Sequence, residues 1–306
     1  TTCGWMMWNW LVSGLLLKST IYLYDGSPFY PNAEVLWDFV DGEKINFMGV
    51  SAKYIDALSK ENINLIDKYK LKNLETIGST GSPLIHESFD YIYTNVKKDV
   101  SVASLSGGTD IVGCFIGGNP LSVVRRGEIQ GPILGMDVHV YDENANSLKN
   151  EKGELVCIKS FPSMPLFFWN DNNNEKYYDA YFNKYENVWC HGDYILKTEN
   201  DGFIIFGRSD ATLNPGGVRI GTAEIYRQVE QIEEVMEGLV VGQIWKGDTR
   251  VVLFVRLNEN SNLTEELIDQ IKTKIKTGAS PRHVPAKIIS IKDIPRTKSG
   301  KIAELA

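Results

Sequence analysis

Apolar positions in the first hundred residues form short runs whose spacing alternates between helical and strand-like. The runs cover 5–17, 20–24, 35–40, 44–48, 51–58, 74–77 and 87–95. Such alternation is typical of an α/β layer built on parallel strands. Turns are predicted at Gly26-Ser27-Pro28 and Gly81-Ser82-Pro83, where glycine and proline interrupt the pattern. Because ligands bind at the carboxyl ends of such strands, these turns mark a candidate binding edge.

The apolar run at 5–17 is the one segment that invites a membrane or leader interpretation. Asn9, Ser13 and Gly14 interrupt it, and no basic residue precedes it. A membrane span needs a longer uninterrupted apolar stretch, and a secretory leader needs a basic start. We therefore expect a buried helix here.

The second half of the chain has a different pattern. Short apolar segments separated by turn signals, at 137–141, 153–158 and 202–206, predict antiparallel strands in a small β-barrel-like part, and the polar tract 170–175 predicts an exposed loop. After residue 210 the order is helix, two strands, helix and strand, at 223–236, 239–245, 250–257, 265–277 and 287–291. This order indicates a small α+β domain. Asn262, with Glu265 three residues later, is the candidate cap of its second helix.

Composition sets limits on the class of protein. The chain has 306 residues, 43% of them hydrophobic, which is enough for one large and one small core. Its net charge of −7 argues against a nucleic-acid-binding protein. Residues 1–210 hold 18 basic and 27 acidic side chains, whereas residues 211–306 hold 14 and 12. This change in charge indicates a domain boundary near residue 210.

The four cysteines are far apart in the chain, at Cys3, Cys114, Cys157 and Cys190. No Cys-x-x-Cys pair and no matching histidine spacing is present, so neither a zinc site nor a disulfide framework is indicated. This use of cysteine fits a reducing, cytoplasmic location.

The strongest chemical signal is the segment 207–225, in which glycines and charges recur with little apolar periodicity. Arg208 and Arg219 stand among glycines that let a backbone approach a ligand, and two guanidinium groups of this kind fit a nucleotide contact. A flexible linker with solvated charges has the same composition, and composition alone leaves both interpretations open.

Segment 207–225 also resembles the hinge motif of the adenylate-forming acyl-CoA synthetases, and four further stretches resemble the same family in the same order. The resemblance covers essentially the whole chain. It implies an α/β fold in which residues 1–208 are part of a large AMP-binding domain. Residues 209–306 would then form a small mobile lid domain that turns about Asp210.

Each stretch carries implied binding roles. Gly81, Ser82 and Pro83 resemble the loop on the adenine side of the family's nucleotide site. The stretch Gly108-Thr109-Asp110 resembles a Thr-Glu pair, in which the threonine contacts the α-phosphate and the acid binds Mg²⁺. Aspartate replaces the usual glutamate here and is one methylene shorter. An acid that only caps a turn is the alternative interpretation.

Later stretches complete the implied site. Asp193 matches the acid that accepts hydrogen bonds from the ribose hydroxyls, while His191 replaces the family's threonine and is interpreted as a structural residue. Arg208 and Arg219 would contact the nucleotide, and Gly217 would lie beside the pantetheine of CoA. Lys301, in a Ser-Gly-Lys motif, matches the catalytic lysine, although an ordinary basic tail has a similar composition.

The resemblance implies ligation of an acid to CoA through an acyl-adenylate, with ATP, Mg²⁺ and CoA as co-substrates and no nucleic-acid or membrane partner. The opening residues resemble the acetoacetate-activating members, which implies acetoacetate as the acid. Acetate-activating relatives have a pocket-closing tryptophan where this chain has Gly107, and glycine is expected to leave room for a longer acid. Two alternatives stay open: a synthetase for acetate or propionate, and an AMP-binding module without catalysis.

The family's glycine-rich phosphate loop has no counterpart in these residues. The chain starts at Thr1 rather than at methionine, so we expect it to be the later part of a longer protein. We also expect the 306-residue chain by itself to be inactive or poorly soluble.

Overall fold

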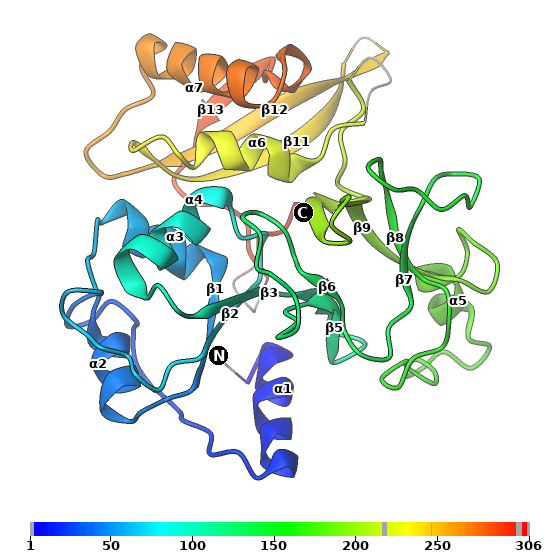
Figure 1. Cartoon of the computed structure of the whole chain (residues 1–306). Coiled ribbons are helices and arrows are strands. Elements are labelled where there is room, and N and C mark those ends of the chain that lie inside the picture. Colours follow the sequence, from blue (N-terminus) through cyan, green and yellow to red (C-terminus); the bar gives the residue numbers. More distant parts are fainter. Residues whose placement is uncertain (1–2, 216–218, 246, 298–301, 305–306) are drawn as a thin grey trace. The chain divides into compact units, whose positions relative to one another are not determined.

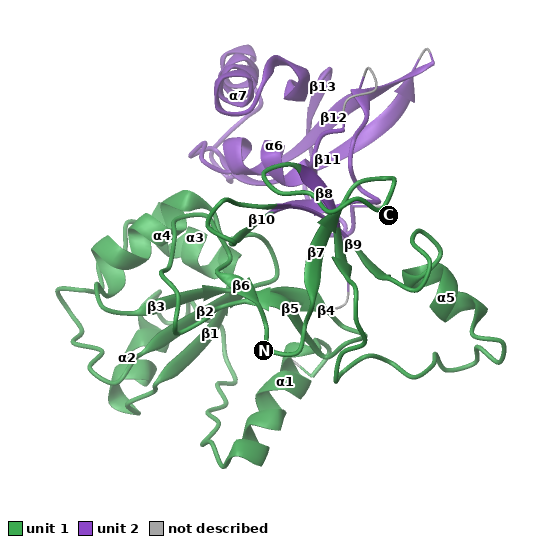
Figure 2. Ribbon diagram, turned by 45° about the vertical axis from the view of Figure 1, so that its right-hand side comes forward, with its two compact units in different colours: residues 1–151, 155–191, 197–204 green, residues 152–154, 192–196, 205–306 purple. Residues whose placement is uncertain are grey.

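The computed structural model describes residues 3–215, 219–245, 247–297 and 302–304. The chain divides into two compact units (Figure 2). Unit 1 comprises 1–151, 155–191 and 197–204, and unit 2 comprises 152–154, 192–196 and 205–306. Each unit contains its own hydrophobic core. Within the described residues, no helix combines the length and apolar character that crossing a bilayer requires.

Unit 1 begins with a parallel sheet, as the sequence predicts. Its strands are β1 (Phe47–Ser51), β2 (Thr76–Thr80) and β3 (Ser101–Ser104), in the order β1-β2-β3 (Figure 1). Helices α2 (Val35–Gly42), α3 (Ala52–Lys60) and α4 (His86–Tyr91) accompany the sheet, and the π-helical turn η2 (Ile92–Val96) continues α4. Burial of Trp37, Ile55, Leu58, Ile77 and Phe89 joins helices and sheet in one core.

Helix α3 illustrates how local chemistry starts an element in this unit. The Ser51 hydroxyl accepts a hydrogen bond from the backbone N–H of Tyr54 at 3.1 Å, which satisfies one of the first free amides of the helix. Ala52, Ile55 and Leu58 then recur at a spacing of three and bury one face. The cap and the apolar face together determine where α3 begins and which way it faces.

Unit 1 also holds an antiparallel sheet of β4 (Ser106–Gly108), β5 (Gly113–Gly117) and β6 (Gly131–Pro132). A further sheet has the order β10-β9-β8-β7, made from β7 (Val138–Tyr141), β8 (Lys152–Cys157), β9 (Trp189–Lys197) and β10 (Phe203–Arg208). The division between the units runs through β8, β9 and β10. Helix α5 (Glu175–Tyr181) follows the predicted polar loop, in which Asp171 is nevertheless buried and accepts two amide hydrogen bonds from α5.

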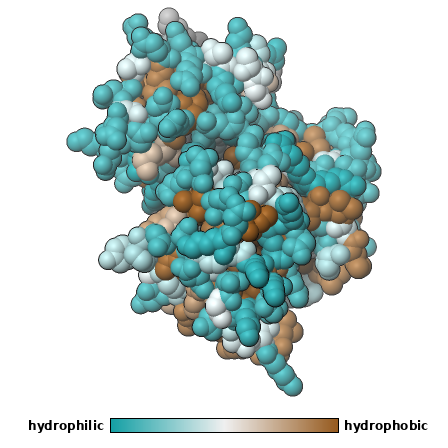
Figure 3. Space-filling view, turned by 60° about the vertical axis from the view of Figure 1, so that its left-hand side comes forward, coloured by the Kyte–Doolittle hydropathy of each residue, from teal (hydrophilic) through white to brown (hydrophobic). Residues whose placement is uncertain are grey.

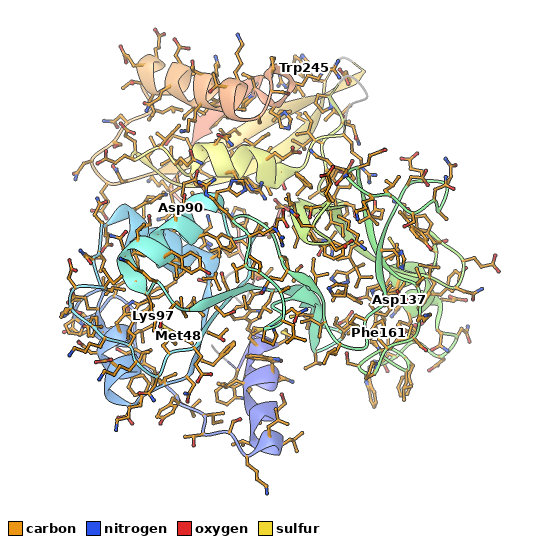
Figure 4. All side chains as sticks on the ribbon, viewed as in Figure 1. Met48, Asp90, Lys97, Asp137, Phe161 and Trp245 are labelled. Carbon is orange, nitrogen blue, oxygen red and sulfur yellow. The ribbon has the colours of Figure 1, made fainter. Side chains whose placement is uncertain are left out.

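Unit 2 is an α+β layer. Strands β11 (Val235–Trp245) and β12 (Asp248–Leu257) are antiparallel, and β13 (Lys287–Ser290) lies parallel to β12. Helices α6 (Thr222–Val229) and α7 (Glu265–Gly278) share a core with this sheet, and the short helix η4 (Pro281–His283) precedes β13. Trp245 lies near the tip of the β11–β12 hairpin, where the Arg250 guanidinium stacks over its ring at 4.0 Å (Figure 4).

Two predicted helices differ from the structure. The helix expected at 223–236 ends at Val229, because the residues from Val235 onward pair with β12 and Met236 lies in that strand. The run 5–17 does form α1 (Met7–Ser13) and the 3₁₀ turn η1 (Gly14–Leu17), but neither contains a buried residue. Leu16 is 86% exposed and Leu17 82%, so the prediction of a buried helix was wrong. Figure 3 shows hydrophobic patches on a mostly hydrophilic face.

The cap of α7 also differs from the prediction. Thr264, not Asn262, precedes the helix, and its hydroxyl accepts a hydrogen bond from the backbone N–H of Leu267 at 3.2 Å. Leu267, Ile271 and Ile275 then bury one face of α7. The Thr264 hydroxyl, at the position just before the helix, satisfies the Leu267 amide. Asn262 lies too far upstream to do so.

We predict that Thr264→Ala destabilises unit 2 by about 1 kcal/mol, because the Leu267 amide loses its acceptor. Asn262→Ala is the matched control and should have a much smaller effect. Urea unfolding followed by circular dichroism measures both. A larger loss for Asn262→Ala than for Thr264→Ala would contradict this assignment of the cap.

Candidate functional site

Strands β9 and β10 bring the predicted ribose acid next to the predicted arginine in unit 2. An Nη1–H of Arg208 donates to Oδ1 of Asp193 at 3.4 Å, and the same guanidinium donates to both carboxylate oxygens of Asp210 at 3.4 Å. Asp193 is only 8% exposed. The structure therefore joins three residues of the predicted site in one charge cluster.

The charge of Arg208 is stabilised by this cluster. Burial acts to lower the pKa of Arg208, but the neighbouring carboxylates of Asp193 and Asp210 outweigh it and raise that pKa. Gly192 lies beside the guanidinium at a φ of +81°, and a Cβ there would come within 2.6 Å of Nη2 of Arg208. The left-handed backbone favours glycine between His191 and Asp193.

A second cluster, which the sequence analysis missed, holds Arg219. Its Nη2 donates to Oε1 of Glu154 at 3.1 Å, and the Ser209 hydroxyl donates to Oε2 of the same carboxylate at 2.6 Å. Glu154 is 2% exposed, and these donors satisfy oxygens of its buried carboxylate. The Arg219 guanidinium also lies 4.9 Å from the centre of the Tyr194 ring. An acid inside the apolar strand 153–158 was the signal for such a buried pair.

The adenine-side turn lies at the end of β2 in unit 1 and is joined to the segment that leads into β4. Gly81 follows β2 directly with a φ of +92°, a conformation that favours glycine. The Thr80 hydroxyl donates to the Leu105 carbonyl at 3.1 Å, and the Leu105 amide donates to the Ser79 carbonyl at 2.8 Å. These bonds join the end of β2 to the segment that leads into β4. The turn that contains Ser82 and Pro83 begins at this end of β2.

Asp110 has a partner that the sequence did not reveal. Thr109 and Asp110 are exposed in the turn between β4 and β5, where the Val112 amide donates to the Thr109 carbonyl at 3.1 Å. The Tyr181 hydroxyl, from α5, donates to Oδ2 of Asp110. Among the described residues, no group of three or more histidine, cysteine or acidic side chains is arranged to hold a metal ion. A cation at Asp110 would therefore take most of its ligands from phosphate or water.

The glycine pair on β4 is packed closely on two sides. A Cβ on Gly107 would lie 2.0 Å from the carbonyl oxygen of Gly113, and one on Gly108 would lie 2.7 Å from Cε1 of His191. Backbone of β5 thus fills the space into which a Cβ at residue 107 would point, so strand packing favours glycine at this position.

Two predicted residues, Gly217 and Lys301, lie outside the described residues. On either side of Lys301, Arg296 and Ile302 form an antiparallel bridge, and the Ala303 amide donates to the Pro295 carbonyl at 2.9 Å. The described residues of the predicted site are divided between the units. Gly81, Ser82, Pro83, Gly107, Gly108, Thr109 and Asp110 belong to unit 1, and Asp193, Arg208, Asp210 and Arg219 belong to unit 2.

A third cluster anchors α6 next to the hinge motif. The Glu224 carboxylate accepts from Nζ of Lys152 at 2.6 Å and from the Gly221 amide at 3.0 Å, and Nε2 of His283 lies 3.6 Å away. Burial acts to raise the pKa of Glu224, but His283, Lys152 and the Gly221 amide outweigh it and lower that pKa from 4.5 to about 2. The ionised carboxylate thus ties α6 to β8 and η4.

Comparison with known proteins gives a consistent result across the whole chain, although no protein-family model matches it. The chain is 59% identical to the acetoacetyl-coenzyme A synthetase of Rhizobium meliloti (strain 1021) over 306 residues and 46% identical to the acetoacetyl-CoA synthetase of Xenopus tropicalis over 308 residues. Each alignment covers 100% of this chain but 47% and 46% of the relative. The chain therefore spans about half the length of the curated relatives it matches.

Solved structures agree with these relatives. Acetoacetyl-CoA synthetase from Streptomyces lividans matches with a TM-score of 0.92 at 41% identity, covering 100% of this chain and 47% of that one. An anthranilate CoA ligase in complex with anthranoyl-AMP matches with a TM-score of 0.75 at 20% identity, over 93% of this chain and 53% of that one. The second likeness is evidence of fold alone. Together they confirm the predicted fold class, a partial adenylate-forming enzyme fold.

The low pKa of Glu224 predicts how unit 2 responds to acid. Its folded-state pKa of about 2 lies below its ordinary value of 4.5, so its stabilising effect is complete above about pH 4.5 and is lost as the pH falls toward 2. The free energy of unfolding of Glu224→Gln should therefore fall short of wild type near neutral pH and approach it in acid. Urea titrations from neutral pH down to about pH 3 measure this difference. Exposed Glu233→Gln is the control, and a pH-independent deficit in Glu224→Gln would contradict the prediction.

Proposed function

Because the chain belongs to the adenylate-forming acyl-CoA synthetase family, we propose that the protein containing it ligates acetoacetate to CoA at the expense of ATP. The products are acetoacetyl-CoA, AMP and pyrophosphate, and the intermediate is an acyl-adenylate. The observation that carries this proposal is the likeness of the whole chain to proteins named acetoacetyl-CoA synthetase. The small-molecule substrates fit a cytoplasmic protein without nucleic-acid or membrane partners.

The nucleotide roles follow the two clusters around the hinge motif. Asp193 accepts hydrogen bonds from the ribose hydroxyls. Its buried carboxylate is held in place for this role by the ion pair with Arg208. The Arg208 side chain is 46% exposed, so its guanidinium is accessible to a nucleotide while it stays paired. Arg219 contacts the phosphate, and it would exchange part of its bond to Glu154 for that contact.

The remaining nucleotide contacts come from the edge of the parallel sheet. Gly81, Ser82 and Pro83 face the adenine, and the backbone of Gly108 and the Thr109 hydroxyl contact the α-phosphate. Asp110 would hold Mg²⁺, since its exposed carboxylate offers the hard oxygen that this ion prefers. When bound, the ion offsets negative charge on the phosphates. Tyr181 orients the Asp110 carboxylate through its hydrogen bond.

Lys301 is the proposed catalytic residue. As the acid oxygen attacks the α-phosphorus and the bond to pyrophosphate breaks, its ammonium stabilises the negative charge that grows on the reacting phosphate. Residues 209–306 act as a lid that turns about Asp210 after the adenylate has formed. Lys301 then leaves the reacting atoms and Gly217 approaches the pantetheine, so that the CoA thiol attacks the acyl carbon and AMP departs.

The proposed acid can be tested with the full-length protein and a panel of short acids. We expect pyrophosphate release to be fastest with acetoacetate at subsaturating concentration, followed by butyrate-sized acids, because one methylene changes selectivity by only about 10–200-fold. The 306-residue chain alone should show no steady release. Preference for acetate or propionate would overturn the proposed acid, and ATP binding without any acid-dependent release would favour an AMP-binding module.

The role of Lys301 predicts that replacing this residue slows the chemical step and leaves nucleotide binding nearly unchanged. Lys301→Ala in the full-length protein should lower acetoacetate-dependent pyrophosphate release by about 10²–10³-fold, because one charge-stabilising donor is removed. Binding of AMP, measured by calorimetry, should change little. Lys298→Ala, in the same basic motif, is the matched control. Equal rates for Lys301→Ala and Lys298→Ala would exclude the assigned role.

A further inference from the structure

The segment that follows β3 depends on its neighbours for its position. Gly107 and Gly108 have no side chains, so β4 gains no packing of its own there. A Cβ added to Gly107 would meet the β5 backbone. One added to Gly108 would lie 2.7 Å from Cε1 of the His191 ring. The ring of His191 and the β5 backbone therefore both border this glycine pair.

His191 also makes a directional bond to the same pair. Its Nε2 lies 3.2 Å from the Gly107 carbonyl oxygen, and the indole Nε1–H of Trp189 donates to its Nδ1 at 3.5 Å. Because the indole nitrogen can only donate, Nδ1 must accept and the proton must lie on Nε2. With Nδ1 as the acceptor, the Nε2–H of His191 donates to the Gly107 carbonyl.

The aromatic cluster around His191 gives this bond a rigid support. His191 is 7% exposed and meets the fully buried Phe115 ring edge-on, with ring centres 4.7 Å apart. Phe161, labelled in Figure 4, packs edge-on against both Phe115 and Trp189, each at 5.3 Å. A buried ring enclosed on these sides has little freedom to rotate away from Gly107.

The same cluster holds the other end of the segment. Tyr181 stacks on Trp189 with ring centres 3.6 Å apart and planes inclined by 14°, and its hydroxyl donates to Asp110. Trp189 thus supports Gly107 through His191 and Asp110 through Tyr181. Each end of the segment 107–110 has its own polar link to one aromatic cluster.

We propose that His191 is a positioning residue for the acid: it sets the place of the Gly107 carbonyl and of the β4 backbone that borders the acyl group. This inference rests on the proposed function and names how that site selects its acid. Side-chain volume at Gly107 cannot do so, because β5 fills that space. His191 acts on the acid through backbone position, whereas the proposed ribose contacts of Asp193 and Arg208 use other side chains.

The test uses the full-length protein and two variants of His191. His191→Phe keeps an aromatic ring of similar shape but removes the donor, and we expect it to raise the KM for acetoacetate about tenfold because the partly buried Gly107 carbonyl loses this hydrogen bond. The KM for ATP should change much less. His191→Gln places an amide N–H near the position of Nε2, and it should recover most of the lost affinity for acetoacetate.

The control is Tyr177→Phe. Tyr177 belongs to the same aromatic cluster, with its ring 6.2 Å from that of Trp189, but its hydroxyl donates to the Pro165 carbonyl at 2.6 Å and not to the segment 107–110. We expect this variant to leave both KM values unchanged. A general loosening of the aromatic cluster would instead alter Tyr177→Phe and His191→Phe alike.

Amide hydrogen exchange over 104–117 provides a readout that needs no turnover. His191→Phe should exchange faster there than wild type, and His191→Gln and Tyr177→Phe should resemble wild type. Unchanged exchange in His191→Phe, or an equal rise in both KM values, overturns the inference. If the wild-type protein shows no acetoacetate-dependent turnover, the proposed function fails and so does the acid-positioning role. The exchange result then still decides whether His191 holds β4.

Discussion

Two buried carboxylates, Asp193 and Glu154, impose the constraint on which the polar part of unit 2 depends. A buried charge without a partner costs several kcal/mol, so each acid must face a guanidinium. Arg208 satisfies Asp193, and Arg219 satisfies Glu154 together with the Ser209 hydroxyl. These pairs fix Arg208 and Arg219, which stand in a segment with few apolar side chains of its own. Arg208 and Arg219 therefore have a structural role of their own, apart from the nucleotide contacts that we propose.

In the function we propose, this arrangement would leave the arginines of the site open to a ligand. The acids are buried, whereas the Arg208 side chain is 46% exposed and the Arg219 side chain 29%. Guanidinium groups have several donors in a fixed fork, so one face can keep the carboxylate while another meets a phosphate or hydroxyl. In the proposed nucleotide site, fixing the arginines in advance would lower the entropy lost on binding.

Unit 1 meets a different constraint, because its predicted phosphate-binding turn is built from backbone. Gly107 and Gly108 allow β4 to approach β5 closely, but they provide nothing that fixes the turn. The aromatic cluster supplies that support through His191 and Tyr181. A backbone segment without side chains at Gly107 and Gly108 thus takes its position from side chains that lie outside it.

The sequence by itself determined the layered α/β order, the small α+β layer and the turn at Gly81, because apolar spacing and glycine punctuation are local properties. It misplaced the end of α6, the cap of α7 and the burial of 5–17, since strand pairing, cap geometry and the covering of an apolar face depend on neighbours. Only the tertiary structure decided the partners of the site residues. Tyr181 and Asp110 are 71 residues apart, His191 and Gly107 are 84 apart, and Arg219 and Glu154 are 65 apart. The type of a residue determines which bonds its side chain can make, but only packing in three dimensions decides which partner comes within reach.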